Sequence, residues 1–376
     1  MKFFTLRVSS CRRVQLARAA ALYSALAAGV VATPNQLAAQ TNVLPLPIPS
    51  VSTIPSNGDV NPYGVAFVPA TVPAGVLQPG SILVSNFNNN QNLQGTGTTI
   101  VQISPIFGTS PFFTSNAGAR QVGLSAALGI LSSGIVIVGY LPTFDGTSAT
   151  AGAGGLIFIN RFGVQLGSLT NVTIDGPWGM AVYDHGNGTA QLFVSNVLNG
   201  TVTRLDLAYS AAGTSVSITD SVTVASGFPH APSPAALELG PSGLVFDPAH
   251  GILYVASEVD SAVYAIASAA TLTASAGTGT LIYQDFTHLH GPLDLAMSPN
   301  GHLLVANSDG TNVDPNQPSE LVEFTTAGQF LGQFPVDPNN GGAFGLAIES
   351  LGWGTIRVAA VDDNQNTLSI WTTVVH

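Results

Sequence analysis

GPWGMAVYDHGNGTAQLFVSNVLNGTVTRLDL, residues 176–207, is the stretch that decides the fold, because its pattern recurs along most of the chain. It begins with Pro-x-Gly and a short apolar strand, and a polar turn then leads to a second strand that ends in a small residue and Asn. A polar loop and a third, alternating strand follow. Repeats of this size indicate an array of similar structural units. Five copies and a degenerate one are found, at residues 61–66, 176–181, 240–245, 291–296 and 342–347, and at residues 121–125.

Each copy is followed by further segments with the alternating apolar residues of β-strands. The predicted second strands are residues 82–85, 135–138, 192–195, 252–256, 303–306 and 356–360. Third strands are clearest at residues 201–207, 261–266 and 320–324, and fourth strands at residues 216–224, 280–283 and 329–334. Six such units predict an all-β fold, a six-bladed β-propeller with four-stranded antiparallel blades.

The small residues of the repeat fit the crowded centre of a propeller. Gly179 and Ala181 lie on one face of the first strand of their unit, where small side chains let six backbones converge on an axis. In the degenerate copy Gly123 is the expected equivalent of Gly179. The last unit ends at residues 371–375, after its third strand, so we expect residues 42–54 to supply the missing outer strand and to close the ring.

The first 39 residues predict a signal peptide rather than part of the fold. They begin with five basic residues, Lys2, Arg7, Arg12, Arg13 and Arg18. The apolar run at residues 19–32 is too short for an ordinary membrane span, and Ala32 and Ala39 are plausible cleavage points. The arginine pair leaves a twin-arginine export route open. We expect a signal peptide at 1–39, one propeller domain at 40–376 and a periplasmic or secreted protein.

The charge of the chain excludes two classes of partner. The formal net charge is −11, and removing the signal peptide leaves four arginines against twenty acidic residues, a net charge of −16 without any lysine. Nucleic acids and anionic membranes need a basic face, so neither is expected as a partner, and no membrane insertion of the mature chain is expected. The single cysteine, Cys11, lies in the signal peptide, so the mature chain has no thiol chemistry. We expect a monomer.

The repeat resembles the NHL-repeat family of six-bladed propellers. The shared pattern is Pro-x-Gly-hydrophobic-Ala, then a strand of the Leu-Tyr-Val-Ala type ending in Asn or Asp, and it covers nearly all of the chain after the signal peptide. An exported bacterial member of the family is implied. The units here are longer than usual, and most third strands lack the customary Arg. The family includes scaffolds, lyases and exported proteins without an assigned activity, so the resemblance does not fix a function.

Two sets of loops are predicted to meet at one face of the ring: those from second to third strand, and those from fourth strand into the next blade. The second set carries His230, His288 and His290. The loops from second to third strand carry Asn86, Asn88, Asn196, Asn199, Glu258, Asp260, Asn307, Asp309, Asp362 and Asp363. Oxygen ligands suit calcium or magnesium, and the resemblance to gluconolactonase-type propellers implies a divalent cation held by Glu, Asn and Asp. The metal candidates are Glu258, Asp260, Asn307, Asp309 and Asp362. The alternative is that these residues form turns and cap their own backbone.

Histidines and aromatic residues give two further hypotheses for the same face. Virginiamycin-lyase-like propellers, which look similar, use a His base beside magnesium, and this makes His288 and His290 the catalytic candidates; the alternative is a surface or turn role. Tyr63, Trp178 and Phe344 share one motif position and suit stacking of a sugar ring or apolar ligand, or else the core between blades. The candidate ligand-binding residues are Tyr63, Trp178, Phe344, Asn86, Asn196 and His230.

Three functions remain open at this point. The first is an exported binding module that takes a small molecule, carbohydrate or protein at the channel mouth, without demonstrated catalysis. The second is a metal-dependent lactonase or lyase, and the third is a structural component of the envelope. No Ser-His-Asp order, nucleophile elbow or phosphate-binding Gly loop is present to decide between them. Whether the protein is an enzyme is therefore left open.

Overall fold

The computed structural model describes residues 43–45, 50–106, 108–115, 122–308, 319–339 and 341–375. The chain divides into two units, Met1–Ala39 and Gln40–His376, and every described residue belongs to the second. The predicted signal peptide lies outside the described residues. Within the ranges just given, no helix has the length and apolar character needed to cross a membrane.

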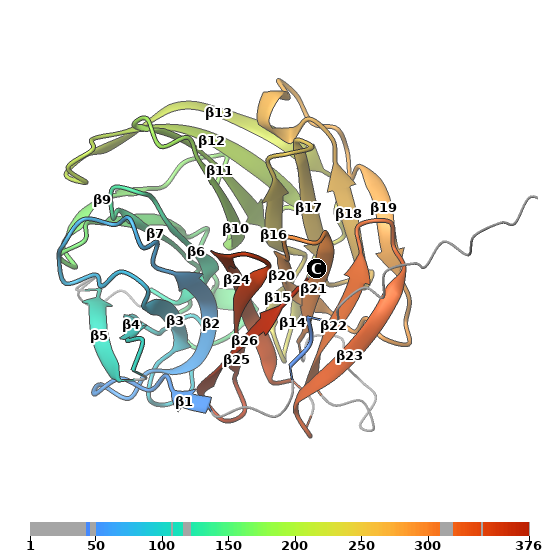
Figure 1. Cartoon of the computed structure of the whole chain (residues 1–376), viewed down its shortest axis with the longest axis horizontal. Helices are drawn as coiled ribbons and strands as arrows, with labels where there is room; N and C mark the ends of the chain where they lie inside the picture. The colour runs from blue at the N-terminus through green and yellow to red at the C-terminus, as the bar shows by residue number, and fades with distance from the viewer. Residues whose placement is uncertain are drawn as a thin grey trace, which may run out of the picture. The chain divides into compact units, whose positions relative to one another are not determined.

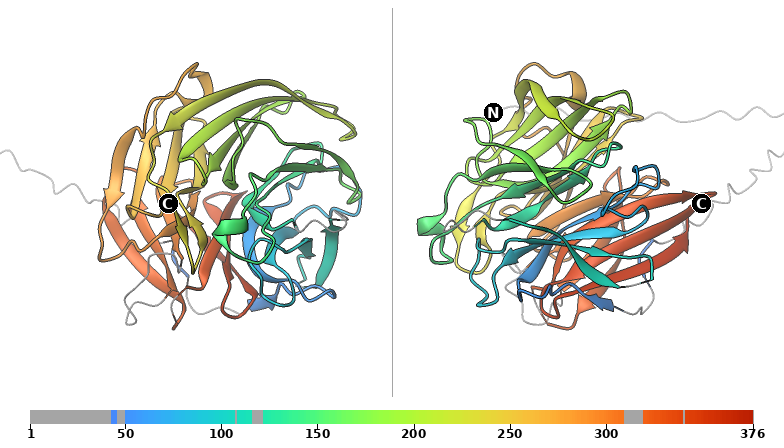
Figure 2. Two further views of the ribbon diagram at one scale, coloured as in Figure 1. Left: turned by 180° about the vertical axis from the view of Figure 1, so that it is seen from behind. Right: turned by 90° about the vertical axis from the view of Figure 1, so that its left-hand side faces the viewer.

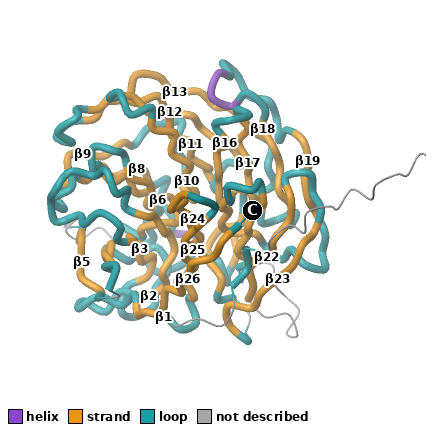
Figure 3. The backbone as a smooth tube through the Cα atoms, in the orientation of Figure 1, coloured by secondary structure: helices purple, strands orange, loops and turns teal. Residues whose placement is uncertain are grey.

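The described strands form six four-stranded antiparallel sheets, which we number as blades 1 to 6 (Figures 1 and 3). Blade 1 comprises β2 (Val60–Phe67), β3 (Ile82–Asn88), β4 (Thr99–Ile103) and β5 (Thr109–Thr114), and blade 2 comprises β6 (Leu124–Ile130), β7 (Val136–Tyr140), β8 (Gly155–Ile159) and β9 (Gln165–Leu169). Blade 3 comprises β10 (Pro177–Asp184), β11 (Thr189–Asn196), β12 (Thr201–Tyr209) and β13 (Val216–Ser226), and blade 4 comprises β16 (Pro241–Asp247), β17 (Ile252–Ser257), β18 (Ala262–Ile266) and β19 (Thr280–Gln284).

Blade 5 comprises β20 (Pro292–Met297), β21 (His302–Asn307), β22 (Ser319–Thr325) and β23 (Phe330–Asp337), and blade 6 comprises β24 (Ala343–Gly352), β25 (Thr355–Asp362), β26 (Thr367–Val374) and β1 (Ser50–Ser52). A separate hairpin, β14 (Ala231–Ser233) with β15 (Leu237–Leu239), lies between blades 3 and 4. Two 3-10 turns, η1 (Ser148–Thr150) and η2 (Ala269–Thr271), complete the described elements.

The inner strands close a ring, which confirms the predicted fold. Strands β2, β6, β10, β16, β20 and β24 each contact the next, and β24 contacts β2. The ring is seen down its axis in Figure 1. The predicted second, third and fourth strands are all present, most of them extended by a few residues at one or both ends. The described part of the chain is therefore an all-β, six-bladed propeller with almost no helix.

The beginning of the described chain closes blade 6, as the sequence predicts. Strand β1 pairs with β26 through Val51 and Leu368 and becomes the outermost strand of the blade. The segment before it is also fixed, because the Val43 backbone N–H donates to the Glu323 carboxylate at 3.1 Å and Trp371 Nε1 donates to the Val43 carbonyl at 3.1 Å. This pairing covers the outer edge of β26 and joins the two ends of the described chain in one blade.

The inner strands of neighbouring blades approach each other closely. In most blades one position of the inner strand, which we call the crowded position, has no room for a side chain. A Cβ on Gly179 would lie 2.1 Å from the Ser242 carbonyl oxygen, and a Cβ on Gly345 would lie 1.8 Å from that of Tyr63. Blade 2 differs from the predicted alignment. Gly179 directly precedes the pair Met180 and Val194, whereas Ala127 directly precedes the equivalent pair, Leu128 and Val138. The assignment of Gly123 to this position was wrong: the Gly123 carbonyl accepts the Leu141 N–H as the Gly176 carbonyl accepts the Val197 N–H, so Gly123 matches Gly176, and the bulge of blade 2 is one residue longer.

Hydroxyl groups tie neighbouring blades together at the same level. Ser85 Oγ donates to the Ser125 carbonyl at 2.8 Å, and Ser125 Oγ donates to the Pro177 carbonyl at 2.6 Å. Ser195 Oγ continues the series to Ser242 at 2.6 Å. These buried bonds satisfy backbone carbonyls that have no strand partner at the inner edge of each blade.

We expect Gly345→Ala to destabilise the propeller by about 3 kcal/mol, because the added Cβ would overlap the Tyr63 backbone. The matched control is Gly167→Ala on β9, where no atom lies within 4 Å of an added Cβ and the change should stay within about 0.5 kcal/mol. Urea unfolding followed by circular dichroism measures both. Equal effects of the two substitutions would contradict the crowding of the inner strands.

Candidate functional site

The predicted polar residues lie at the face where the inner strands begin and the second strands end. Pro177 at the start of β10 pairs with Asn196 at the end of β11, and Pro292 at the start of β20 pairs with Asn307 at the end of β21. We call this side of the ring the mouth face. The loops from second to third strand and the connections between blades all lie there, as the repeat pattern predicts.

Several of the predicted side chains hold the backbone of the connections between blades. Asn196 Oδ1 accepts the Asp175 N–H at 3.0 Å, and Asn307 Oδ1 accepts the His290 N–H at 3.1 Å. Glu258 Oε2 accepts the Gly240 N–H at 3.2 Å. All three acceptors are fully buried. Their position at the end of a second strand places an acceptor beside each incoming loop, so they have a capping role in the fold.

Other predicted rim residues have local partners. Asn86 Nδ2 donates to Thr99 Oγ1 at 3.2 Å, and Asn88 Nδ2 donates to Asn92 Oδ1 at 2.7 Å. Asn199 Oδ1 accepts the Thr201 hydroxyl at 2.7 Å. The Asp363 backbone N–H donates to the Gly342 carbonyl at 2.8 Å. These contacts lie in blades 1, 3 and 6.

Two of the acidic metal candidates interact with neighbouring side chains. Asp260 Oδ2 accepts the Tyr264 hydroxyl at 2.5 Å, and burial together with this bond raises the pKa of Tyr264 to about 12. Asp362 lies near Asp337 at blades 5 and 6, where burial and the Asp337 charge raise its pKa to about 6. Asp309 lies outside the described residues. Within the described ranges, no three His, Cys, Asp or Glu side chains are grouped to hold a metal ion.

The two catalytic candidates lie in the connection between blades 4 and 5. His288 Nδ1 lies 2.6 Å from Asp285 Oδ2, and the His288 ring stacks on Phe330 with a centroid distance of 3.9 Å. His290 Nε2 lies 3.1 Å from the Thr287 carbonyl oxygen. His230, in contrast, is exposed at the base of hairpin β14–β15.

Asp285 is the centre of a dense set of hydrogen bonds. It accepts the Tyr283 hydroxyl at 2.6 Å and the backbone N–H groups of His288 at 2.7 Å and Leu289 at 3.1 Å, besides the His288 ring. Burial acts to raise the pKa of Asp285, but the bonds from His288, Tyr283 and the backbone outweigh it and lower that pKa. The ionised Asp285 therefore fixes the His288 ring through Nδ1 and leaves Nε2 as the ring nitrogen for another group.

Glu320 at the start of β22 is a residue that the sequence reasoning did not select as functional. Its side chain is 1% exposed, and within the described residues its carboxylate oxygens have no hydrogen bond of regular geometry, although the Asn307 amide lies close enough to act on the carboxylate. Burial raises the pKa of Glu320 to about 7, while the charge of His288 and the Asn307 side chain act to lower it. We call Asp285, His288, Asn307 and Glu320 the blade 4–5 cluster.

A sequence signal for Glu320 was present. Residues 320, 322 and 324 of an alternating strand share one face, and Val322 and Phe324 are apolar and fully buried. A carboxylate in phase with core residues is a buried charge, which needs a partner or a shifted pKa. Asp285 was harder to find, because Asp-x-x-His also forms an ordinary turn at Asp247 and His250, where the distance is 2.6 Å and the ring is largely exposed.

The three aromatic candidates do come together. Ring centroids of Tyr63 and Phe344 are 4.8 Å apart, and those of Tyr63 and Trp178 are 5.5 Å apart. Phe87 packs against both Tyr63 and Trp178, at 4.8 Å and 5.3 Å. We call these four residues the aromatic cluster. All four are buried, and Leu237 of hairpin β14–β15 packs in the same apolar core.

The charge of the described surface limits the ligands that the protein can bind. Arg204 pairs with Asp206 at 3.1 Å, Arg357 pairs with Glu349, and Arg161 donates to the carbonyls of Ala74 and Ala212. All three arginines among the described residues are therefore engaged within the fold. Anionic ligands lack a free cationic partner in this part of the chain.

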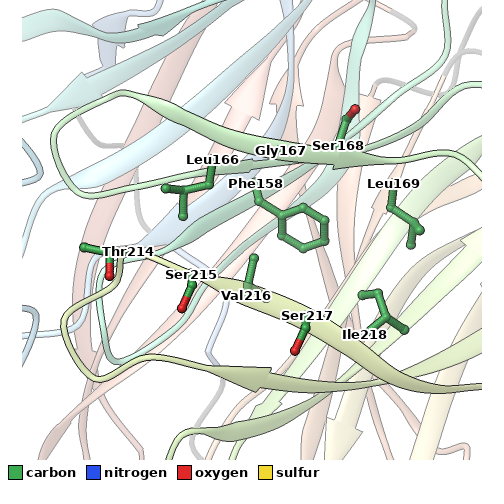
Figure 4. A pocket seen from close by; sticks show the side chains of 10 residues that line it. All are labelled: Phe158, Leu166, Gly167, Ser168, Leu169, Thr214, Ser215, Val216, Ser217 and Ile218. Carbon is green, nitrogen blue, oxygen red and sulfur yellow. The ribbon is translucent and has the colours of Figure 1, made fainter.

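A pocket of about 290 Å³ lies away from these residues, between the outermost strands of blades 2 and 3. Figure 4 shows its walls, which come from β9 and from the start of β13, with the Phe158 ring between them. Apolar and hydroxyl side chains line it, and none of the predicted site residues does. It has no titratable group to contribute to chemistry.

No protein-family model and no curated protein matches the sequence. Among solved structures, the chain is similar to regucalcin of Agrobacterium tumefaciens, described as a calcium-binding protein, with a TM-score of 0.51 and 11% identity over 88% of this chain and 95% of that one. A DUF4623 family protein of Bacteroides eggerthii has a TM-score of 0.52 and 11% sequence identity, over 90% of this chain and 78% of that one. A luciferin-regenerating enzyme has a TM-score of 0.49 and 12% sequence identity, over 87% of this chain and 95% of that one. At these identities the likeness shows the fold, a β-propeller.

Proposed function

We propose that the protein is an exported binding module that takes a small molecule at the blade 4–5 cluster on the mouth face. The observation that carries the proposal is Glu320, whose carboxylate is 1% exposed and has no hydrogen bond of regular geometry within the described residues, with only the Asn307 amide acting on it. A buried carboxylate without a partner is costly, and a ligand that supplies the missing bond recovers part of that cost. Export is proposed from the signal-peptide pattern of residues 1–39.

The chemistry of the cluster favours a ligand that donates hydrogen bonds or carries positive charge. The Glu320 carboxylate can accept two or more such bonds, and its pKa of about 7 lets it ionise when a cation arrives. His288 Nε2 adds one further polar contact beside it. An anionic ligand would meet two carboxylates, Asp285 and Glu320, and no free arginine among the described residues.

A small molecule fits the cluster better than a macromolecule does. Glu320 is almost fully buried, and His288 and Asp285 have side-chain exposures of only 28% and 31%. Only a slender group reaches a carboxylate at that depth. Ligand affinity then depends on one or two strong bonds to Glu320 rather than on a broad contact area.

A second function is favoured by the Asp285–His288 pair. A carboxylate that fixes Nδ1 orients the imidazole so that Nε2 can take a proton, which is the arrangement of a general base. This supports a metal-dependent lactonase or lyase, with calcium or magnesium as the divalent cation. Regucalcin, a calcium-binding protein, shares the fold, and this adds a reason to test calcium first. Glu258, Asp260, Asn307, Asp309 and Asp362 remain the proposed metal ligands.

The binding proposal is tested with three probes of equal size and different charge: n-propylammonium, 1,2-propanediol and propionate. We expect propylammonium, and more weakly the diol, to raise the melting temperature at millimolar concentration, because binding to the native state stabilises it. Propionate should not. Glu320→Gln should abolish the propylammonium shift, whereas His250→Ala, in the matched turn of blade 4, should keep it. Equal shifts in wild type and Glu320→Gln would rule out this site.

Stability should depend on pH through Glu320. Its folded-state pKa is about 7 against an ordinary 4.5, so the unfolded chain loses this proton first and the free energy of unfolding falls as the pH rises between these values. At pH 8 the free energy of unfolding of Glu320→Gln should be larger than that of the wild type by on the order of 2 kcal/mol. This difference should disappear below pH 4.5, where the wild-type carboxyl is protonated in both states. Urea unfolding at a series of pH values measures the difference. If the free energies of unfolding of the two proteins differ by the same amount at every pH, the pKa of Glu320 is not raised in the folded protein.

The catalytic alternative is tested by hydrolysis of γ-butyrolactone and gluconolactone with calcium, with magnesium and with EDTA. If His288 is the base, His288→Ala should lower kcat/KM by about 100-fold or more, since general-base catalysis contributes that much. His250→Ala is the control for loss of an Asp-x-x-His turn. Absence of hydrolysis under all conditions, together with no effect of EDTA on melting temperature, would remove the metal-dependent hypothesis.

A further inference from the structure

Hairpin β14–β15 belongs to no blade and reaches across the mouth face. It leaves the chain between blades 3 and 4, yet the Ala235 carbonyl at its turn accepts Gln94 Nε2 of blade 1 at 3.0 Å, and the Leu237 carbonyl accepts Ser148 Oγ of blade 2. The left view of Figure 2 shows the hairpin on the side toward the viewer, near the centre of the ring. Its contacts join parts of the ring that are far apart along the chain.

Leu237 fills the space above the aromatic cluster. Its side chain is 1% exposed and belongs to the same apolar core as Tyr63, Trp178 and Phe344, which come from the inner strands of blades 1, 3 and 6. The hairpin thus contributes an apolar side chain to a core that three inner strands share.

The closed arrangement carries two unfavourable features. Trp178 is 0% exposed, and its Nε1–H has no acceptor within the described residues, although buried indole N–H groups usually have one. Leu237 has φ of 62°, in the left-handed region that disfavours residues with a side chain. A state in which the hairpin lifts and an acceptor reaches Trp178 would relieve both.

The hairpin is a short two-stranded sheet, attached by the buried side chains of residues 236–239 and by a few hydrogen bonds. Each of its strands has three residues, a length that is marginal for an isolated two-stranded sheet. Pro232 and Pro234 are exposed and have no N–H with which to bond a neighbour. The polar contacts described above, from Gln94 and Ser148, are made by side chains and need no rearrangement of a blade to break.

We propose that hairpin β14–β15 is a lid over a second binding site, and that the aromatic cluster takes an uncharged, ring-bearing molecule with a hydrogen-bond acceptor. The ring of the ligand replaces the Leu237 side chain against Tyr63 and Phe344, and its acceptor bonds Trp178 Nε1. Aromatic walls suit planar rings, and the cluster has no charged side chain to balance a charged ligand. The site is independent of the blade 4–5 cluster and of the function proposed there.

The test follows the indole N–H signals of ¹⁵N-labelled protein by NMR. The chain has three tryptophans, Trp178, Trp353 and Trp371, and Trp178→Phe identifies the signal of interest. Acetanilide, an aromatic ring with a carbonyl acceptor, is expected to move the Trp178 signal downfield as the new bond forms. Toluene has the ring without the acceptor and is expected to cause no downfield shift. Trp353 is fully exposed and serves as an internal reference.

Leu237→Gly tests the lid directly, because it removes the side chain that fills the site and relaxes the left-handed backbone. It should bind acetanilide about tenfold more tightly than the wild type, since less of the binding energy goes into opening. Leu239→Gly, on the same hairpin but outside the aromatic cluster, is the matched control and should bind as the wild type does.

The proposal is overturned if saturating acetanilide leaves the Trp178 signal in place in the wild type. The wild-type titration decides the question by itself if Leu237→Gly does not fold. Glu320→Gln should retain the full response to acetanilide, so failure of the blade 4–5 site and failure of the lid site are separate results.

Discussion

The close approach of the six inner strands to one axis is the constraint on which the structure depends. At Gly179 and Gly345 the next blade lies where a side chain would start, and Ser195 passes a hydrogen bond to the Ser242 carbonyl of the following blade. Because the strands meet in this way, loops that are far apart in sequence come together on the mouth face. The aromatic cluster exists only through that convergence, since it takes residues from the inner strands of blades 1, 3 and 6, whereas the blade 4–5 cluster comes from one connection and the blade that follows it.

The repeat pattern was sufficient for the fold and failed where a unit departs from the pattern. Regular alternation and the Pro-x-Gly motif located all six blades, and the missing outer strand of the last unit correctly predicted the closing role of β1. Blade 2 was misaligned, because Gly123 corresponds to Gly176, the first glycine of the motif, and one extra residue in the bulge then places Ala127 at the crowded position. Hairpin β14–β15 was not predicted, since residues 231–239 contain two prolines and no clear alternation.

For the site, the sequence located the face but not the roles of the residues. Asn196 and Asn307 lie on the mouth face as expected, yet they cap backbone N–H groups, because every connection between blades brings unsatisfied donors to the end of a second strand. An Asn or Glu at the end of a second strand is expected in either role, as a backbone cap or as a metal ligand. The sequence pattern therefore does not distinguish the two roles. Glu320 and Leu237 show the opposite case, because their importance depends on burial and backbone conformation, and neither can be read from a residue type alone.

Blade 5 departs from the repeat at the crowded position, and two of its carboxylates have pKa values raised to about 7. Asp294 replaces the glycine of the crowded position, accepts the Leu346 N–H of blade 6 at 2.8 Å, and has a pKa raised by burial to about 7. On β22, Glu320 lies in the blade 4–5 cluster, while Glu323 bonds His302 at 2.5 Å and the backbone of Val43. Residues three apart on a strand point to opposite faces, so one strand supports the proposed ligand site on one side and the closing segment of the ring on the other. A ligand that changes the charge of Glu320 therefore acts on the strand that holds the propeller closed.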